Sequence, residues 1–217
     1  MFKFKDIIVR KHFSLGEEIA HSISHGAGLL LGIAALVLLV IKGALRGNPL
    51  YIISMLIYSV SLIFLYTNSM FYHAFPEGKA KNIFERLDHS SIYILIAGTY
   101  TPFYFFAIGG IIGIVICCIQ WLLAILGVIF KVLWIEKYTK IHVLIFLIMG
   151  WMIIFFAATI YKTVSLGGFV LLLSGGLCYS IGVLFFVFDW FKYHHFVWHL
   201  FVLAGSILLF FTIYFFI

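Results

Sequence analysis

Charged side chains are scarce in this sequence of 217 residues: Asp, Glu, Lys and Arg make up 10% of it, whereas 65% is hydrophobic. Soluble domains have about 25% charged and about 45–50% apolar residues. The composition therefore excludes an ordinary soluble domain and indicates a protein of the lipid bilayer. A secretory signal peptide is also missing, because the basic stretch MFKFKDIIVRKHF has no continuous apolar core. We therefore expect the first hydrophobic run to remain in the mature protein.

Cysteine is equally sparse, and its pattern excludes two further classes. Cys117, Cys118 and Cys178 lie inside apolar runs, their number is odd, and no CxxC spacing occurs. A disulfide framework or a thiolate metal site is therefore not expected. We predict that the three thiols are small packing residues.

Long uncharged runs are what the sequence has instead. Residues 89–130 contain no Asp, Glu, Lys or Arg, and a helix of that length would extend about 63 Å, twice the thickness of the bilayer core. The run must hold two helices, and Gly109–Gly110 is the expected turn; the SLGG at 165–168 is a second break. The sequence predicts an all-α membrane protein, with a cytoplasmic segment at 1–16 and a single bundle of seven transmembrane helices in 17–217. The expected helices are approximately residues 17–41, 50–75, 86–108, 110–130, 140–161, 165–189 and 193–217.

The basic residues indicate the orientation of this bundle. If the N-terminus is cytoplasmic, eleven basic residues lie on the inner side and three on the outer side. The inner residues are Lys3, Lys5, Arg10, Lys11, Lys79, Lys81, Arg86, Lys131, Lys137, Lys140 and Lys192, and the outer ones are Lys42, Arg46 and Lys162. Such a bias agrees with the positive-inside rule, so the net charge of +6 reflects topology and does not indicate nucleic-acid binding. The odd number of helices places the C-terminus outside.

The same map places all histidines and acidic residues at or near the cytoplasmic helix ends. Ser69 and His73 are one turn apart at the end of the second helix, and Asp88 opens the third. His195 and His199 share a face of the seventh. Three histidines from two helices can bind a tetrahedral zinc ion and leave a position for water. Asp88 could orient a ligand or deprotonate that water, and a metal would explain imidazoles at membrane depth.

Other interpretations of these residues stay open. Asp88 could pair with Arg86 or Lys81, and Ser69 could be a hydroxyl that packs helices together. A rival metal set lies on the first helix, where Glu17, His21 and His25 recur every four residues.

Glu18 and His25 are seven residues apart on the same helix. We predict His73, His195 and His199 as ligands and His21 and His25 as non-ligands, because five nitrogens exceed what a tetrahedral zinc accepts. Glu18 and His25 are then expected as polar support near the site.

Two local patterns predict details of helix packing. Gly28 and Gly32 in GLLLG give a small-xxx-small stripe suited to close packing within the bundle. Pro102 removes one backbone hydrogen bond from the third helix, so we expect a kink near Gly98 beside a cavity in the membrane.

At these residues the chain resembles the hemolysin III family, the bacterial branch of the progestin and adiponectin receptor group. The resemblance spans nearly the whole chain and rests on EEIAHSISHG, SMFYHAF, RLDHSSIYILIAGTYTPF and HHFVWH in this order. It implies a seven-helix bundle with the N-terminus inside, and zinc on His73, His195 and His199 beside Ser69 and Asp88. One departure is that the family usually has Asn where this chain has His21. The wider superfamily includes alkaline ceramidases, and the adiponectin receptors resemble amide hydrolases that act on ceramide.

These observations lead to a functional expectation with two alternatives. We expect a zinc-dependent hydrolase of a membrane lipid amide or ester, with Asp88 as general base and Ser69 as hydrogen-bond donor, located in the bacterial plasma membrane and active in lipid homeostasis. The alternatives are a receptor or membrane-state sensor with structural zinc, and a hemolysin-type cytolytic protein. The sequence leaves open the substrate, whether turnover occurs, and the oligomeric state.

Overall fold

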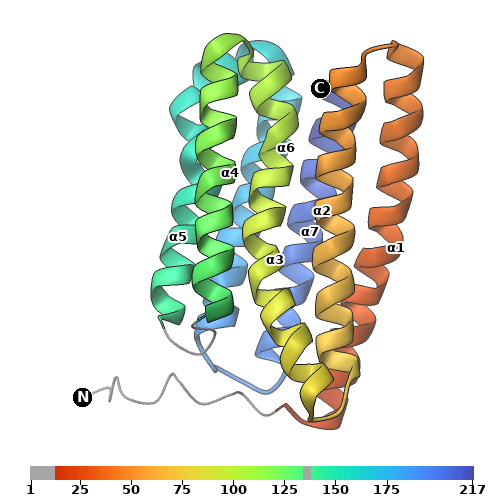
Figure 1. Ribbon diagram of the computed structural model, residues 1–217, viewed down its shortest axis with the longest axis vertical. Helices are drawn as coiled ribbons and strands as arrows, with labels where there is room; N and C mark the ends of the chain where they lie inside the picture. The colour runs from red at the N-terminus through yellow and green to blue at the C-terminus, as the bar shows by residue number, and fades with distance from the viewer. Residues whose placement is uncertain (1–12, 134–137) are drawn as a thin grey trace.

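The computed structural model describes residues 13–133 and 138–217, and every regular element in these ranges is helical (Figure 1). The elements are α1 (Leu15–Arg46), α2 (Pro49–Ala74), α3 (Lys79–Phe103), the π-helical turn η1 (Tyr104–Ile108), α4 (Gly110–Leu133), α5 (Thr139–Trp151), the 3-10 turn η2 (Met152–Phe156), α6 (Ala157–Val187) and α7 (His194–Phe216). Within the described ranges, six helical stretches are long and apolar enough to cross a membrane. The prediction of an all-helical, multi-pass membrane protein is confirmed. Most of the segment predicted at 1–16 lies outside the described residues.

The stretch Thr139–Val187 is longer than one membrane crossing needs. It has 49 residues, which would extend about 74 Å as one straight helix. Ser165 interrupts it with φ 57° and ψ −177°, so two helical parts meet at a kink there. Figure 1 shows the chain reversing direction near the end of the bundle that holds the C-terminus. This break lies at the start of the SLGG where the sequence predicts one.

The turn between α3 and α4 also lies where the sequence predicts it. Gly109 and Gly110 have φ values of 70° and 57°, a conformation that glycine adopts without steric cost. The third helix continues beyond Pro102, and its helix type changes at Tyr104 to a π-helical turn. Gly98 packs tightly on α2, because a Cβ atom there would lie 2.3 Å from the hydroxyl oxygen of Ser61.

The beginning of α3 differs from the sequence prediction, which starts this helix at residue 86. In the structure α3 begins at Lys79, and its first turns contain KAKNIFE. Lys, Ala, Glu and Arg are good helix formers, so the helix continues past the apolar core into this polar segment. Lys81 is buried there at 4% exposure, although periodicity of apolar residues gives no reason to expect this.

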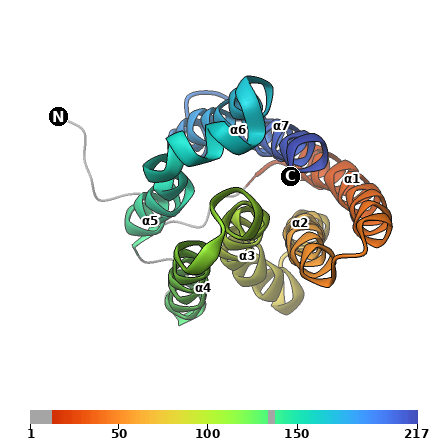
Figure 2. The ribbon, with the colours of Figure 1, turned by 90° about the horizontal axis from the view of Figure 1, so that it is seen from above.

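The helices of the bundle pack closely, and the ends of α1, α2, α3 and α7 that carry the predicted site residues lie at one end of it. Seen from above, α3 lies nearest the middle of the bundle, with α2 and α4 beside it (Figure 2). Gly28 of α1 faces the ring of Tyr66 on α2, and Gly32 faces Ile63, which confirms that the GLLLG stripe packs within the bundle. The start of α1, the end of α2 and the starts of α3 and α7 lie at the same end of the molecule (Figure 1).

Large apolar side chains cover the outside of the bundle. Leu30, Ile111 and Phe155 are 69%, 71% and 83% exposed, and exposed leucines and isoleucines recur along α1, α2 and α4. An apolar surface of this extent is the kind that faces lipid. The outer surfaces of the helices therefore suit a membrane.

Candidate metal centre

Three histidines from two helices meet at the end of the bundle where α1 begins. His73 lies near the end of α2, and His195 and His199 occupy the first two turns of α7. All three side chains are buried, and one nitrogen from each lies within 4.8 Å of one from each of the others. The structure thus brings together the three residues that the sequence predicts as ligands, in an arrangement that could hold a metal ion.

A carboxylate orients the first of these histidines. Oε2 of Glu18 lies 2.5 Å from Nδ1 of His73, and the ammonium group of Lys81 donates a hydrogen bond of 2.8 Å to Oε1 of the same carboxylate. Nε2 of His73 is buried and has no hydrogen-bond partner among the described residues. A carboxylate on one ring nitrogen and an unpartnered second nitrogen is the arrangement that metal-binding histidines normally have. His73 therefore fits a metal ligand.

His199 has its own supporting contacts on α1. Its Nδ1 lies 3.2 Å from the hydroxyl oxygen of Ser24 and 3.3 Å from the carbonyl oxygen of His21. The ring of His25 stacks on it, with 3.6 Å between ring centroids. His25 is thus a packing partner of His199, as expected of polar support near the site.

The predicted catalytic residues border the same site. Ser69 and Asp88 line a cavity together with His195 and His199. The hydroxyl oxygen of Ser69 is buried without a hydrogen-bond partner in the described ranges. The cavity has a volume of about 20 Å³, and one buried water needs a cavity of roughly 10–15 Å³. The cavity therefore has room for one water molecule beside the histidines.

The two alternative partners of Asp88 make other contacts. Lys81 bonds to Glu18. Arg86 donates from Nη1 to the carbonyl oxygen of Val132, 2.6 Å away. Both basic side chains therefore have partners other than Asp88.

The rival set of Glu17, His21 and His25 is not assembled. Glu17 caps α1, accepting hydrogen bonds from the backbone and hydroxyl of Ser14 at 2.9 and 2.7 Å. Its other oxygen accepts from the backbone N–H of Tyr193, 3.0 Å away, just before α7. Glu17 is thus the N3 residue of a capping box with Ser14 as the N-cap, and it also holds the backbone just before α7. A different set, Glu18, His21 and His73, brings its ligand atoms within 4.8 Å of one another.

Sequence reasoning missed Lys81 and Ser24 as contributors to this site. Ser24 could have been found, because Glu17, His21, Ser24 and Gly28 follow the i, i+3, i+4 pattern of one buried helix face. Lys81 carried no such signal, because its role depends on how the start of α3 meets α1.

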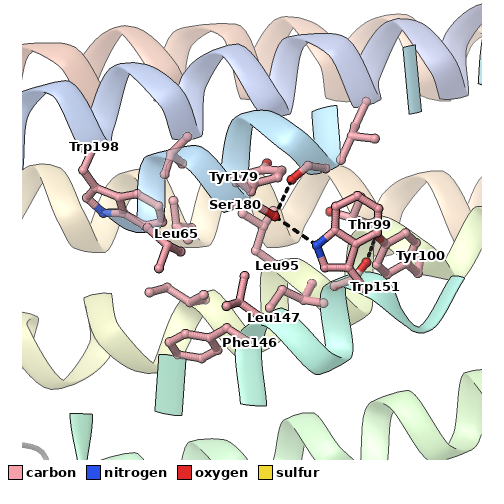
Figure 3. A pocket seen from close by; sticks show the side chains of 17 residues that line it. Leu65, Leu95, Thr99, Tyr100, Phe146, Leu147, Trp151, Tyr179, Ser180 and Trp198 are labelled. Carbon is pink, nitrogen blue, oxygen red and sulfur yellow. Dashed lines mark hydrogen bonds between the residues drawn. The ribbon is translucent and has the colours of Figure 1, made fainter. Parts of the chain in front are cut away.

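A larger apolar cavity adjoins the histidine site (Figure 3). Its volume is about 90 Å³, and it shares Leu65, Ile92, Trp198 and Val202 with the small cavity. Two polar groups at its wall are bonded within the protein: Trp151 donates to the hydroxyl of Ser180, which itself donates to the carbonyl of Gly176, both at 2.9 Å. The hydroxyls of Tyr100 and Tyr179 are also bonded within the protein, and Thr99 adds one further hydroxyl. The rest of the lining is aliphatic and aromatic, so this cavity suits an apolar group.

Comparison with known proteins shows the family to which this chain belongs. The family model described as "Haemolysin-III related" matches residues 13–210. The chain belongs to the haemolysin-III-related family. It is 41% identical over 204 residues to the "Hemolysin-3 homolog" of Bacillus subtilis (strain 168), covering 94% of this chain and 96% of that protein.

Two further relatives of this family member span a wide range of organisms. The chain is 41% identical over 201 residues to "Hemolysin-3" of Bacillus cereus, covering 93% of this chain and 92% of the relative. It is 30% identical over 156 residues to the human "Monocyte to macrophage differentiation factor", covering 69% and 64%. No solved structure matches the chain.

Proposed function

We propose that this haemolysin-III-related protein is a zinc-dependent hydrolase of a membrane lipid amide or ester that takes part in lipid homeostasis. The observation that carries the proposal is the convergence of His73, His195 and His199 beside a cavity with room for one water. Three protein ligands with a remaining position for water are typical of catalytic zinc, whereas structural zinc normally has four protein ligands.

Zinc bound there would polarise a carbonyl group and lower the pKa of water to about 7. Asp88 would accept a proton from the attacking water and return it to the leaving nitrogen or oxygen, so that the products are a fatty acid and an amine or alcohol. Ser69 would donate a hydrogen bond to the negative charge that develops on the carbonyl oxygen. Both side chains line the small cavity, which supports these roles.

The apolar cavity supports a lipid as the substrate. Its wall continues into the small cavity through the shared residues Leu65, Ile92, Trp198 and Val202. A hydrocarbon chain in the larger cavity would therefore bring a carbonyl group at its end towards the histidines. Because the wall of this cavity is mainly apolar, it favours the hydrocarbon chain of a lipid over a polar, soluble metabolite.

The proposed location is the bacterial plasma membrane, with seven crossings and a cytoplasmic N-terminus. The kink at Ser165 supports two crossings within Thr139–Val187. The six apolar stretches of the described residues would then make seven crossings, because this stretch counts twice. The excess of Lys and Arg at the histidine end supports a cytoplasmic position for the metal centre.

The test is lipid turnover by the purified protein in detergent or liposomes. We expect hydrolysis of at least one class of lipid amide or ester, with loss of activity on chelation and recovery with zinc. Asp88→Asn should lower kcat by about 10²–10⁴-fold, and it should keep zinc. Full zinc occupancy without turnover across lipid amides and esters would refute the hydrolase and leave a metal-binding sensor.

The name of the Bacillus cereus relative, "Hemolysin-3", favours cytolysis as a second candidate. A pore in one chain needs polar side chains through the full depth of the membrane. Dye release from liposomes that contain the purified protein would distinguish the two. Release that is unaffected by Asp88→Asn would favour cytolysis.

A further inference from the structure

Two buried histidines of α1, His21 and His25, have ring nitrogens without hydrogen-bond partners in the described residues. His25 stacks on His199, whereas the three-histidine site leaves His21 unexplained. Its exposure is 0%, and neither of its ring nitrogens has a hydrogen-bond partner in residues 13–133 and 138–217. Burying an imidazole without a partner is unfavourable. Its ring centroid lies 4.5 Å from that of His73, 4.9 Å from that of His195 and 5.0 Å from that of His199. His21 therefore lies inside the cluster, on the side of α1.

Glu18 presents one carboxylate oxygen to both His21 and His73. Oε2 lies 3.9 Å from Nδ1 of His21 and 2.5 Å from Nδ1 of His73. The ligand atoms around a tetrahedral zinc with bonds of about 2.0–2.1 Å are roughly 3.3 Å apart. The two observed distances lie on either side of this value, and the ligand nitrogens of His21 and His73 lie within 4.8 Å of each other. Side-chain movements would therefore create the required geometry. Lys81 holds the other oxygen of Glu18 and fixes the carboxylate in this direction.

We propose that Glu18, His21 and His73 form a second position for a divalent cation, beside the three-histidine set and sharing His73 with it. This inference depends on the proposed zinc site, because His73 is a ligand in both positions. Two imidazole nitrogens and one carboxylate oxygen are ligands that zinc accepts. The position also supplies the partner that the buried ring of His21 lacks.

The two positions use opposite nitrogens of His73 and exclude each other. Nδ1 of His73 faces Glu18, whereas Nε2 is buried without a partner. A neutral imidazole has one ring nitrogen protonated and one available as a ligand. Moving an ion from the three-histidine set to the second position therefore moves the ring proton from Nδ1 to Nε2 by exchange with water, with no net gain or loss of protons. One ion per chain is expected, with His73 as its constant ligand.

The second position is the more accessible of the two. The side chain of Glu18 is 17% exposed, whereas His195 and His199, the ligands found only in the first set, are 7% and 1% exposed. Lys81 adds a positive charge next to the carboxylate, which weakens cation binding there. We therefore expect the three-histidine set to hold the ion at equilibrium and the second position to hold it when that set is broken.

The experiment measures zinc per chain and the visible spectrum of the cobalt-substituted protein in detergent. The variant His195→Ala/His199→Ala removes two ligands of the first set and leaves the second intact. We expect this double variant to bind one ion at saturating metal, with a changed cobalt spectrum. Adding His21→Asn, which keeps a polar side chain, should abolish binding, whereas adding His25→Ala should not. Circular dichroism on every variant shows whether the helices are retained.

The outcomes separate this inference from the proposed function. If wild type binds zinc and the folded double variant binds none, the second position does not exist, while the three-histidine site stands. If His21→Asn leaves binding by the double variant unchanged, His21 is not a ligand and the inference is wrong. If wild type binds no zinc while the double variant does, the three-histidine site fails and the second position stands. Should the double variant not fold, His195→Ala alone with and without His21→Asn gives the same comparison.

Discussion

Nδ1 of His73 lies 2.5 Å from Oε2 of Glu18, so a carboxylate on the first turn of α1 fixes a ring at the end of α2. This contact crosses 55 residues of sequence. It orients Nε2 of His73 towards the proposed ion and increases the basicity of the ring.

We predict that Glu18→Gln lowers zinc affinity at the three-histidine site by about 10–100-fold, the usual effect of removing a carboxylate behind a ligating histidine. Competition with a chromophoric chelator measures this affinity. Glu77→Gln, which removes a charge at an exposed position of the neighbouring turn, is the matched control and should have no effect. Equal affinities for the two variants would contradict the orienting role of Glu18.

The adjacent residues His194 and His195 allow a direct test of which histidine binds the ion. Nδ1 of His194 lies 2.7 Å from the carbonyl oxygen of Phe185 and its Nε2 lies 3.0 Å from Asp189, so this ring faces the end of α6. We predict that His195→Ala binds zinc far more weakly than wild type, because a ligand of the three-histidine set is removed and only the weaker second position remains, whereas His194→Ala keeps the wild-type affinity. Zinc content and competition with a chromophoric chelator, measured on both purified variants, test this difference in affinity. Zinc loss in His194→Ala alone would contradict the assignment.

The apolar cavity predicts a dependence on chain length. Gly150 borders it, and a Cβ atom there would meet no atom within 4 Å. Gly150→Leu should occupy part of the space and raise KM for long-chain lipids more than for short-chain ones. Gly150→Ala adds a single methyl group and should have little effect. An equal loss for all chain lengths would indicate that the cavity does not hold the hydrocarbon chain.

Contact between α1 and α2 predicts a stability effect away from the site. A Cβ atom on Gly28 would lie 2.5 Å from the ring of Tyr66. Gly28→Leu should destabilise the protein by about 1–3 kcal/mol or more, as overpacking does. Leu30→Ala, at a position that is 69% exposed, should change stability by about 0.5 kcal/mol or less. Thermal unfolding in detergent, followed by tryptophan fluorescence, measures both.

The sequence predicted those parts of the fold and site that depend on local spacing. Uncharged runs locate the apolar helices, Gly109–Gly110 gives a turn, and the i, i+4 relation places His195 and His199 on one face. These features need no knowledge of which helices are neighbours. The meeting of His73 with this pair was inferred from a common membrane level, and the structure agrees.

The parts that the sequence did not predict depend on tertiary neighbours. The pairing of Lys81 with Glu18 requires α3 to begin early and to pass α1, which no local pattern indicates. The capping role of Glu17 was hidden because its four-residue spacing to His21 also fits a ligand set. Periodicity shows which residues share a helix face, but it does not show what that face contacts.

The last prediction concerns the orientation of the bundle. Lys79, Lys162 and Lys192 are all exposed, and the kink at Ser165 puts Lys162 at the opposite end of the bundle from the other two. In a background where Cys117, Cys118 and Cys178 are replaced by alanine, single cysteines at these positions should react differently with an impermeant thiol reagent on intact cells. We expect Lys162→Cys to react from outside, and Lys79→Cys and Lys192→Cys to react only after the membrane is opened. Labelling of Lys79→Cys from outside would invert the topology and place the histidine cluster on the external side. Labelling of Lys162→Cys only from inside would instead remove a crossing from the Thr139–Val187 stretch.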